Sequence, residues 1–332
     1  MWELLHCISE EVGLLSAIVF IFPYVLCVMV VNDNPKKIDY LFVCKILAIC
    51  TLCMCFVVFS KMILDSGFNI ANAMLNMKRF GMFSTMEEGS IYFNPNALGY
   101  FCLFAVIGIV QKIQWEAYGI SDLIISGALI ICGFLTLSRT YVICFVITIV
   151  LFVIAKKGIV RGKIKTSFMI AGMLLIISII LAKVFPDILN DLISRFSVKD
   201  ISNGRIQLIT VYNEYIGDSV KNLMWGTGLV ARKIKIDNYF GTINMQVPHN
   251  GLQELVVVWG VLGMVIWFVF MLSLIIKTRK RNSNQGLVNY IPLIVLMIKV
   301  QAGQMVSSYY TMLMFSLAFL SLCYDFKKNN LS

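Results

Sequence analysis

The hydrophobic positions of this chain gather in long runs that short polar segments separate. Each run is typical of a membrane-spanning helix, because about 20 apolar residues at about 1.5 Å each cross a hydrocarbon layer of about 30 Å. The runs cover residues 12–31, 40–62, 97–113, 120–137, 141–155, 167–185, 252–276, 287–301 and 304–323. The pattern predicts an all-α, polytopic integral membrane protein of about nine transmembrane helices, with a single membrane domain over residues 1–332.

Composition and charge narrow the class of protein further. Hydrophobic residues make up 59% of the chain and charged residues 14%, against about 45–50% and about 25% in soluble domains, which excludes a soluble globule. The net charge of +10 is dispersed among the gaps between runs and is not clustered as a nucleic-acid partner requires. We therefore expect no nucleic-acid partner.

The ten cysteines indicate packing and not cross-linking. Apart from Cys7, they lie inside apolar runs, and the polar segment 186–250 contains none. Cys53 and Cys55 lack the spacing of a zinc site. We expect no disulfide framework and no bound metal.

Lysine and arginine in short loops predict the orientation. With the N-terminus outside, only Arg139 and Lys299 lie on the outer flanks that the rule counts. Fourteen of the 28 positive residues are then inside: Lys36, Lys37, Lys112, Lys156, Lys157, Arg161, Lys163, Lys165, Lys277, Arg279, Lys280, Arg281, Lys327 and Lys328. This distribution predicts an N-out, C-in topology, in which the long polar segments 65–96 and 186–250 are extracytoplasmic and carry the function.

His249 is the candidate for proton transfer. It follows Val247-Pro248 at the end of the 186–250 loop, just before the seventh run. A neutral imidazole at a water-membrane boundary suits a general base. The alternative is an exposed histidine beside a helix N-cap.

A family signature surrounds this histidine. The signature is a histidine followed by Asn, Ser or Gln, then nine residues, a glycine, two residues and a second glycine. His249, Asn250, Gly260 and Gly263 occupy its fixed positions. The segment therefore resembles the O-antigen ligase and Wzy-type O-antigen and capsular polysaccharide polymerase family. Gly260 and Gly263 are three residues apart, a spacing that lets a neighbouring helix approach closely. We interpret these glycines as packing positions.

Two arginines strengthen the resemblance. Asn203-Gly204-Arg205-Ile206 looks like the family's arginine motif opening an amphipathic helix, in which Ile206, Ile209 and Tyr212 would face the bilayer. Arg139 stands in a Ser-Arg-Thr turn similar to the family's Ser-Arg turn, whose arginine is thought to contact the lipid-linked sugar diphosphate. A guanidinium suits a diphosphate because it donates two parallel hydrogen bonds. The alternatives are a solvated loop arginine and a tolerated interfacial one.

Two further segments resemble family motifs. Asn94-Pro95-Asn96 precedes a run as in the family's Asn-Pro-Asn segment, where Asn also caps a helix and Pro suits its first turn. Trp225-Gly226-Thr227-Gly228 resembles a Gly-x-Gly step, and we expect a turn there.

The resemblance implies a GT-C-like glycosyltransferase that is inverting and independent of metals and cofactors, which agrees with the lack of an Asp-x-Asp sequence. It would transfer glycan from a polyprenyl-diphosphate-linked oligosaccharide at the outer face of a bacterial cytoplasmic membrane. His249, Arg205 and Arg139 would be catalytic, and Asn250, Asn94 and Asn96 would bind substrate. Membrane lipid and other polysaccharide-assembly membrane proteins are the partners that it implies.

Three activities remain open. A polymerase and an O-antigen ligase use the same donor and differ in the acceptor, whereas a lipid-linked glycan flippase needs a polar path through the bilayer. Abundant Ile, Lys and Asn suggest an AT-rich genome, common among bacteria without an outer membrane, which favours the polymerase.

Family members usually have about twelve spans, so nine spans with an outer N-terminus correspond to that plan without its three leading helices.

Overall fold

The chain folds into two compact units. The computed structural model describes residues 14–32, 39–75, 77–84, 89–91, 93–115, 119–155, 205–229, 234–237, 243–281, 286–306 and 308–325. One unit, here the α12 unit, comprises Met1–Pro35, Asp200–Gln285 and Pro292–Asp325, and the other, the α5 unit, comprises Lys36–Lys199, Gly286–Ile291 and Phe326–Ser332. The predicted span 167–185 lies outside the described residues, and each of the other predicted spans overlaps a helix.

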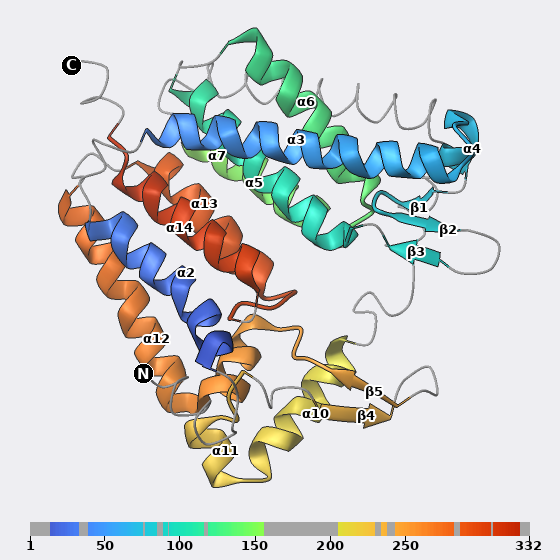
Figure 1. Ribbon diagram of the computed structural model, residues 1–332. Helices are drawn as coiled ribbons and strands as arrows, with labels where there is room; N and C mark the ends of the chain where they lie inside the picture. Colours follow the sequence, from blue (N-terminus) through green and yellow to red (C-terminus); the bar gives the residue numbers. More distant parts are fainter. Residues whose placement is uncertain are drawn as a thin grey trace. The chain divides into compact units, whose positions relative to one another are not determined.

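The α5 unit is built around one buried helix (Figure 1). Its helix α5 packs against α3, α6 and α7, and most of its residues are buried. The elements of this unit are α3 (Tyr40–Asp65), α4 (Ile70–Leu75), β1 (Met77–Arg79), β2 (Met82–Ser84), β3 (Gly89–Ile91), α5 (Pro95–Gln114), α6 (Ile120–Leu135) and α7 (Arg139–Ala155). The first five residues of α13 (Leu287–Val300) also belong to it.

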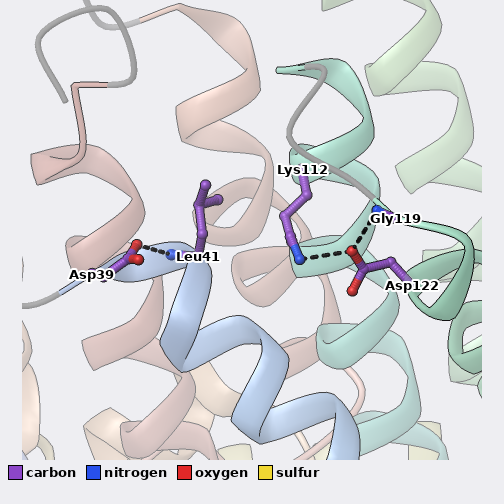
Figure 2. A network of polar contacts seen from close by, with 5 residues as sticks. All are labelled: Asp39, Leu41, Lys112, Gly119 and Asp122. Atoms are coloured by element: carbon purple, nitrogen blue, oxygen red, sulfur yellow. Dashed lines mark hydrogen bonds and ion pairs between the residues drawn. The ribbon is translucent and has the colours of Figure 1, made fainter. Parts of the chain in front are cut away.

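A buried ion pair joins α5 to α6 at the end of α5 remote from Asn94 (Figure 2). Lys112 Nζ donates to Asp122 Oδ2 at 2.8 Å, and the two side chains are only 9% and 6% exposed. The same carboxylate oxygen accepts the backbone N–H of Gly119 at 3.0 Å. Nearby, Asp39 caps α3 by accepting the N–H of Leu41 at 2.9 Å. The buried charges of Lys112 and Asp122 need these partners, because an ionised group that is removed from water without a counter-charge or hydrogen bonds is strongly destabilising.

The α12 unit contains the long helix α12 and its neighbours. Helix α2 packs against α14 and α12. Cys27 Sγ lies 3.3 Å from Ser316 Oγ, and Lys277 Nζ donates to Asn32 Oδ1 at the ends of α12 and α2. The elements are α2 (Leu14–Asn32), α10 (Arg205–Gly217), α11 (Val220–Trp225), β4 (Ile234–Asp237), β5 (Ile243–Gln246), α12 (Gly251–Arg281), the rest of α13, and α14 (Tyr309–Cys323).

The helices carry the surface of a membrane protein. Helices α3, α5 and α12 are long and apolar enough to cross a membrane, and several shorter apolar helices accompany them. Large apolar side chains are exposed along α3, such as Phe42, Phe56 and Val57, and along α12, such as Ile266 and Val269. Apolar faces of this extent mark contact with another apolar phase, which for helices of this length is lipid.

Two small antiparallel sheets correct the expectation of helices alone. Strands β1, β2 and β3 form one sheet with the register Met82↔Ile91, and β4 pairs with β5 with the register Ile234↔Gln246. Both sheets lie within the two long polar segments. Three- and four-residue strands carry too little period-two pattern to be recognised in a sequence, so they were missed.

Candidate functional site

His249 occupies a fixed place at the start of α12. It is half-buried and precedes the N-cap residue, Asn250. Asn250 Oδ1 accepts the N–H groups of Leu252 at 3.1 Å and Gln253 at 3.0 Å, while its Nδ2 donates to the Gln301 carbonyl at 3.2 Å. Both ends of the Asn250 amide are therefore held by the protein, and the backbone that presents His249 is held with them.

The first turn of α12 is anchored to the turn between α13 and α14. Glu254 is fully buried, and its Oε2 accepts the N–H groups of Met305 at 2.5 Å and Val306 at 2.9 Å. Gly251 faces the same turn, where a Cβ would stand 2.8 Å from the Val300 carbonyl oxygen. A carboxylate in the first helical turn also suits the helix dipole. Glu254 is thus a structural residue that fixes the helix beside His249.

Gln253 connects α12 to the helix that Arg205 opens. Its Nε2 donates to the Ile209 carbonyl at 2.7 Å and to Asn213 Oδ1 at 2.8 Å. Tyr212 and Ile216 of α10 pack in a core cluster with Val257 of α12. The structure therefore brings the helix of Arg205 and the helix of His249 into direct contact.

This packing corrects the predicted orientation of α10. Tyr212 is 0% exposed and faces α12, whereas it was expected to face the bilayer. Ile206 is 66% exposed, and Ile209 is half-buried. A stripe of apolar positions cannot distinguish a lipid neighbour from a protein one, because both present an apolar surface.

Helix α12 is interrupted at Gly260, which has a φ of 68° and a ψ of −178°. The turn after α11 fills the interruption: Thr227 N donates to the Val257 carbonyl at 2.8 Å, and Gly228 N donates to the Val258 carbonyl at 2.9 Å. A Cβ on Gly226 would stand 2.5 Å from Gly260 N. The Trp225–Gly228 segment forms the predicted turn. Gly260 lies against the backbone of Met224 and Trp225 at the end of α11, so it is the close-packing position that the sequence predicts, although it also interrupts its own helix.

Arg139 is the first residue of α7 in the α5 unit. It follows Ser138, whose Oγ accepts the N–H of Tyr141 at 3.4 Å, and its side chain is half-buried. Leu137 has a φ of 51°, a conformation that costs a leucine about 1–3 kcal/mol. The surrounding turn, with Thr136 Oγ1 donating to the Gly133 carbonyl at 2.6 Å, holds Leu137 in this strained conformation directly before the Ser-Arg-Thr segment.

Asn94 and Asn96 lie in the same unit. Asn94 Oδ1 accepts the N–H groups of Asn96 at 2.9 Å and Ala97 at 3.4 Å, with Pro95 in the first turn. Asn94 is therefore the N-cap of α5, as its sequence predicts. The Asn96 side chain accepts a hydrogen bond from Arg79 NH2 at 2.8 Å.

Arg79, like Gln253, is a residue that sequence reasoning missed. Its Nε donates to the Thr136 carbonyl at 2.8 Å, so it links the start of α5, through Asn96, to the turn that carries Arg139. The adjacent Phe80 N also donates to the Leu135 carbonyl at 2.9 Å. The only signal in the sequence was a pair of basic residues, Lys78-Arg79, in a segment assigned to the outer side.

The predicted site residues fall into two groups. His249, Asn250 and Arg205 lie in the α12 unit, and Arg139, Asn94 and Asn96 lie in the α5 unit. Among the residues that the structure describes, no three His, Cys, Asp or Glu side chains are grouped as a metal site. The α12 unit offers a histidine just before one helix and an arginine at the start of another, and the α5 unit offers an arginine at the start of α7. These groups suit proton transfer and anion binding.

These features define a helical membrane protein with polar sites at helix ends. A family model described as O-antigen ligase matches residues 124–268, a range that includes Arg139, Arg205 and the His249–Gly263 signature. Residues 124–268 are therefore similar to the O-antigen ligase family, which confirms the resemblance and supports a polysaccharide-related function in general. No curated protein matches the chain.

Proposed function

We propose that this protein is a polysaccharide polymerase acting at the outer face of the cytoplasmic membrane. It transfers glycan from a polyprenyl-diphosphate-linked donor to a lipid-linked saccharide acceptor. The observation that carries the proposal is the match to the O-antigen ligase family across Arg139, Arg205 and His249. The fixed helix start at Asn250 supports it, because a general base needs a defined position.

In the proposed reaction, His249 accepts the proton of the acceptor hydroxyl. The hydroxyl oxygen attacks the anomeric carbon of the donor from the side opposite the diphosphate, a C–O bond forms, and the bond to the diphosphate oxygen breaks. Polyprenyl diphosphate leaves with the bonding electron pair. The configuration at the anomeric carbon is inverted, and the protein's own groups suffice without a metal ion.

Arg205 and Arg139 are proposed to bind the diphosphate. Charge grows on the leaving oxygen during the reaction, and a guanidinium placed there stabilises it more in the transition state than in the ground state. Arg205 opens a helix that Gln253 holds against α12, and Arg139 opens α7. Arg79 is proposed to position the Arg139 turn through its bond to Thr136.

The proposed orientation is N-out and C-in. Helices α5 and α6 are antiparallel neighbours, because Lys112 near the end of α5 pairs with Asp122 near the start of α6. Asn94, Arg79 and Thr136 gather at the opposite end. The fourteen inner basic residues support placing the Lys112 end inside, which leaves the Arg139 turn outside.

The second candidate is a ligase, which the description of the matched family favours. Deletion of the gene distinguishes the two activities. Loss of a polymerase leaves single repeat units on the carrier lipid and removes the polymer length ladder, and this is the expected result. Accumulation of full-length polymer on the carrier, unattached to its final anchor, would instead identify a ligase.

A further inference from the structure

The depth of α11 in the membrane follows from two neighbouring helices. The bond between Lys277 and Asn32 places the ends of α12 and α2 at one level. From Asn32 back to Leu14, α2 rises about 27 Å, and from Lys277 back to Gly260, α12 rises about 26 Å. Both lengths approach the thickness of the hydrocarbon layer, about 30 Å, so Gly260 lies near the opposite boundary of that layer.

Helix α11 lies at this boundary because its last turn contacts Gly260. A Cβ on Gly260 would stand 2.5 Å from Trp225 N, and the following residues bond to Val257 and Val258. The helix therefore ends beside the point where α12 enters the hydrocarbon layer. Beyond Gly260, α12 exposes Leu262, Val265 and Ile266, which continue an apolar surface away from α11.

Three large apolar side chains of α11 are exposed: Val220 by 78%, Trp225 by 50% and Leu223 by 38%. At 100° per residue, Val220 and Leu223 share one side of the helix, and Trp225 points about 140° away from Val220. One flat protein surface does not cover side chains that diverge in this way, whereas a lipid interface surrounds them. Lys221, exposed between them, suits the phosphates of lipid headgroups.

We propose that α11 is an interfacial anchor, in which Val220, Leu223 and Trp225 insert into the headgroup region of the bilayer. A tryptophan at that depth is energetically favoured because its ring is amphipathic. The anchor holds the turn that fills the α12 interruption, and so holds the start of α12 close to the lipid surface. This inference depends on a membrane-embedded α12 and not on the polymerase chemistry.

Tryptophan quenching tests the proposal on the full-length protein in vesicles of phosphatidylcholine and phosphatidylglycerol. The Trp225 signal is the fluorescence difference between the parent protein and Trp225→Phe. Bromine near the top of the acyl chains should reduce this signal more than bromine near the chain ends, and iodide in the water should have a small effect. Quenching by iodide alone, or by none of the three, would overturn the proposal, since Trp225 would then face water or protein.

Charged variants separate anchoring from folding. Leu223→Glu and Val220→Glu should decrease the bromine quenching of Trp225, whereas Asn222→Glu on the same helix should leave it near the parent value. An equal decrease of bromine quenching in all three variants would contradict the proposal that Val220 and Leu223 anchor α11 in the lipid. The measurement needs no substrate, so a failure of the polymerase assignment would leave the quenching result unchanged.

Discussion

Single residues at the start of α12 have distinct tasks. Asn250 and Glu254 bond to the α13–α14 turn, and Gln253 bonds to α10. Their side chains are engaged in holding three segments together. His249 precedes this anchored turn and is the residue that we propose as the general base.

Replacing His249 by alanine should lower turnover by about 10²–10⁴-fold, because the general base is lost. Membrane insertion should be unchanged, since the bonds of Asn250 and Glu254 remain. Polymer formation by the purified protein in vesicles gives the turnover. His6→Ala is the control, because His6 is the other histidine of the chain. Normal turnover of a well-inserted His249→Ala variant would assign His249 a structural role.

The arginines are tested by conservative replacement. Arg205→Lys and Arg139→Lys should each lower turnover by about tenfold or more, because an ammonium keeps the charge but loses the paired donors. Arg279→Lys, at the far end of α12, is the control and should be neutral. If lysine supports full activity at both positions, charge alone is sufficient there and bidentate binding is contradicted.

Most helices follow from the sequence, whereas their tertiary contacts do not. Runs of apolar residues predicted the helices, and Asn94-Pro95 predicted the cap of α5, since both signals are local. The interruption of α12 was missed because Gly260 depends on a backbone contact with Gly226, 34 positions earlier. Arg79 and Gln253 were missed for the same reason: their partners are distant in the sequence.

The contact of Gly226 with Gly260 is an element-scale feature that substitution can test. Gly260→Ala or Gly226→Ala should destabilise the protein by about 2 kcal/mol or more, because each combines a positive φ with a steric clash. Thermal unfolding in detergent measures the effect. Gly127→Ala in α6 is the control: no atom lies within 4 Å of its added Cβ, so it should stabilise by about 0.5–1 kcal/mol. Equal stability of all three variants would rule out a fixed interruption.

The Lys112–Asp122 pair gives a second test between elements. Asp122→Asn should destabilise by about 3–5 kcal/mol, because Lys112 stays buried without its counter-charge. Lys112→Met combined with Asp122→Leu should recover most of the loss. Asp65→Asn in the exposed Lys61–Asp65 pair is the control, with an expected cost of about 0–1 kcal/mol. If Asp122→Asn and Asp65→Asn lose similar amounts of stability, burial does not determine how much each ion pair contributes.

At the scale of the whole molecule, orientation decides where the chemistry occurs. Reporters fused after Lys165 and after Arg281 should report the cytoplasm, and a reporter near Asn222 should report the outside, because basic loops are retained inside. Enzymatic and fluorescent topology reporters make this measurement. A cytoplasmic signal near Asn222 would overturn the proposed mechanism too, since His249 and Arg205 would face the wrong compartment.

The pairing of α2 with α14 has a consequence for biosynthesis. Cys27 and Ser316, which meet in this pair, are separated by 289 positions. A ribosome delivers the chain from its N-terminus, so α2 enters the membrane long before its neighbour exists. Until α12 and then α14 are synthesised, α2 lacks both of the helices that it packs against. Completion of the α12 unit is therefore a late event, and a ribosome that stops before α14 releases a chain in which α2 contacts α12 but never meets α14.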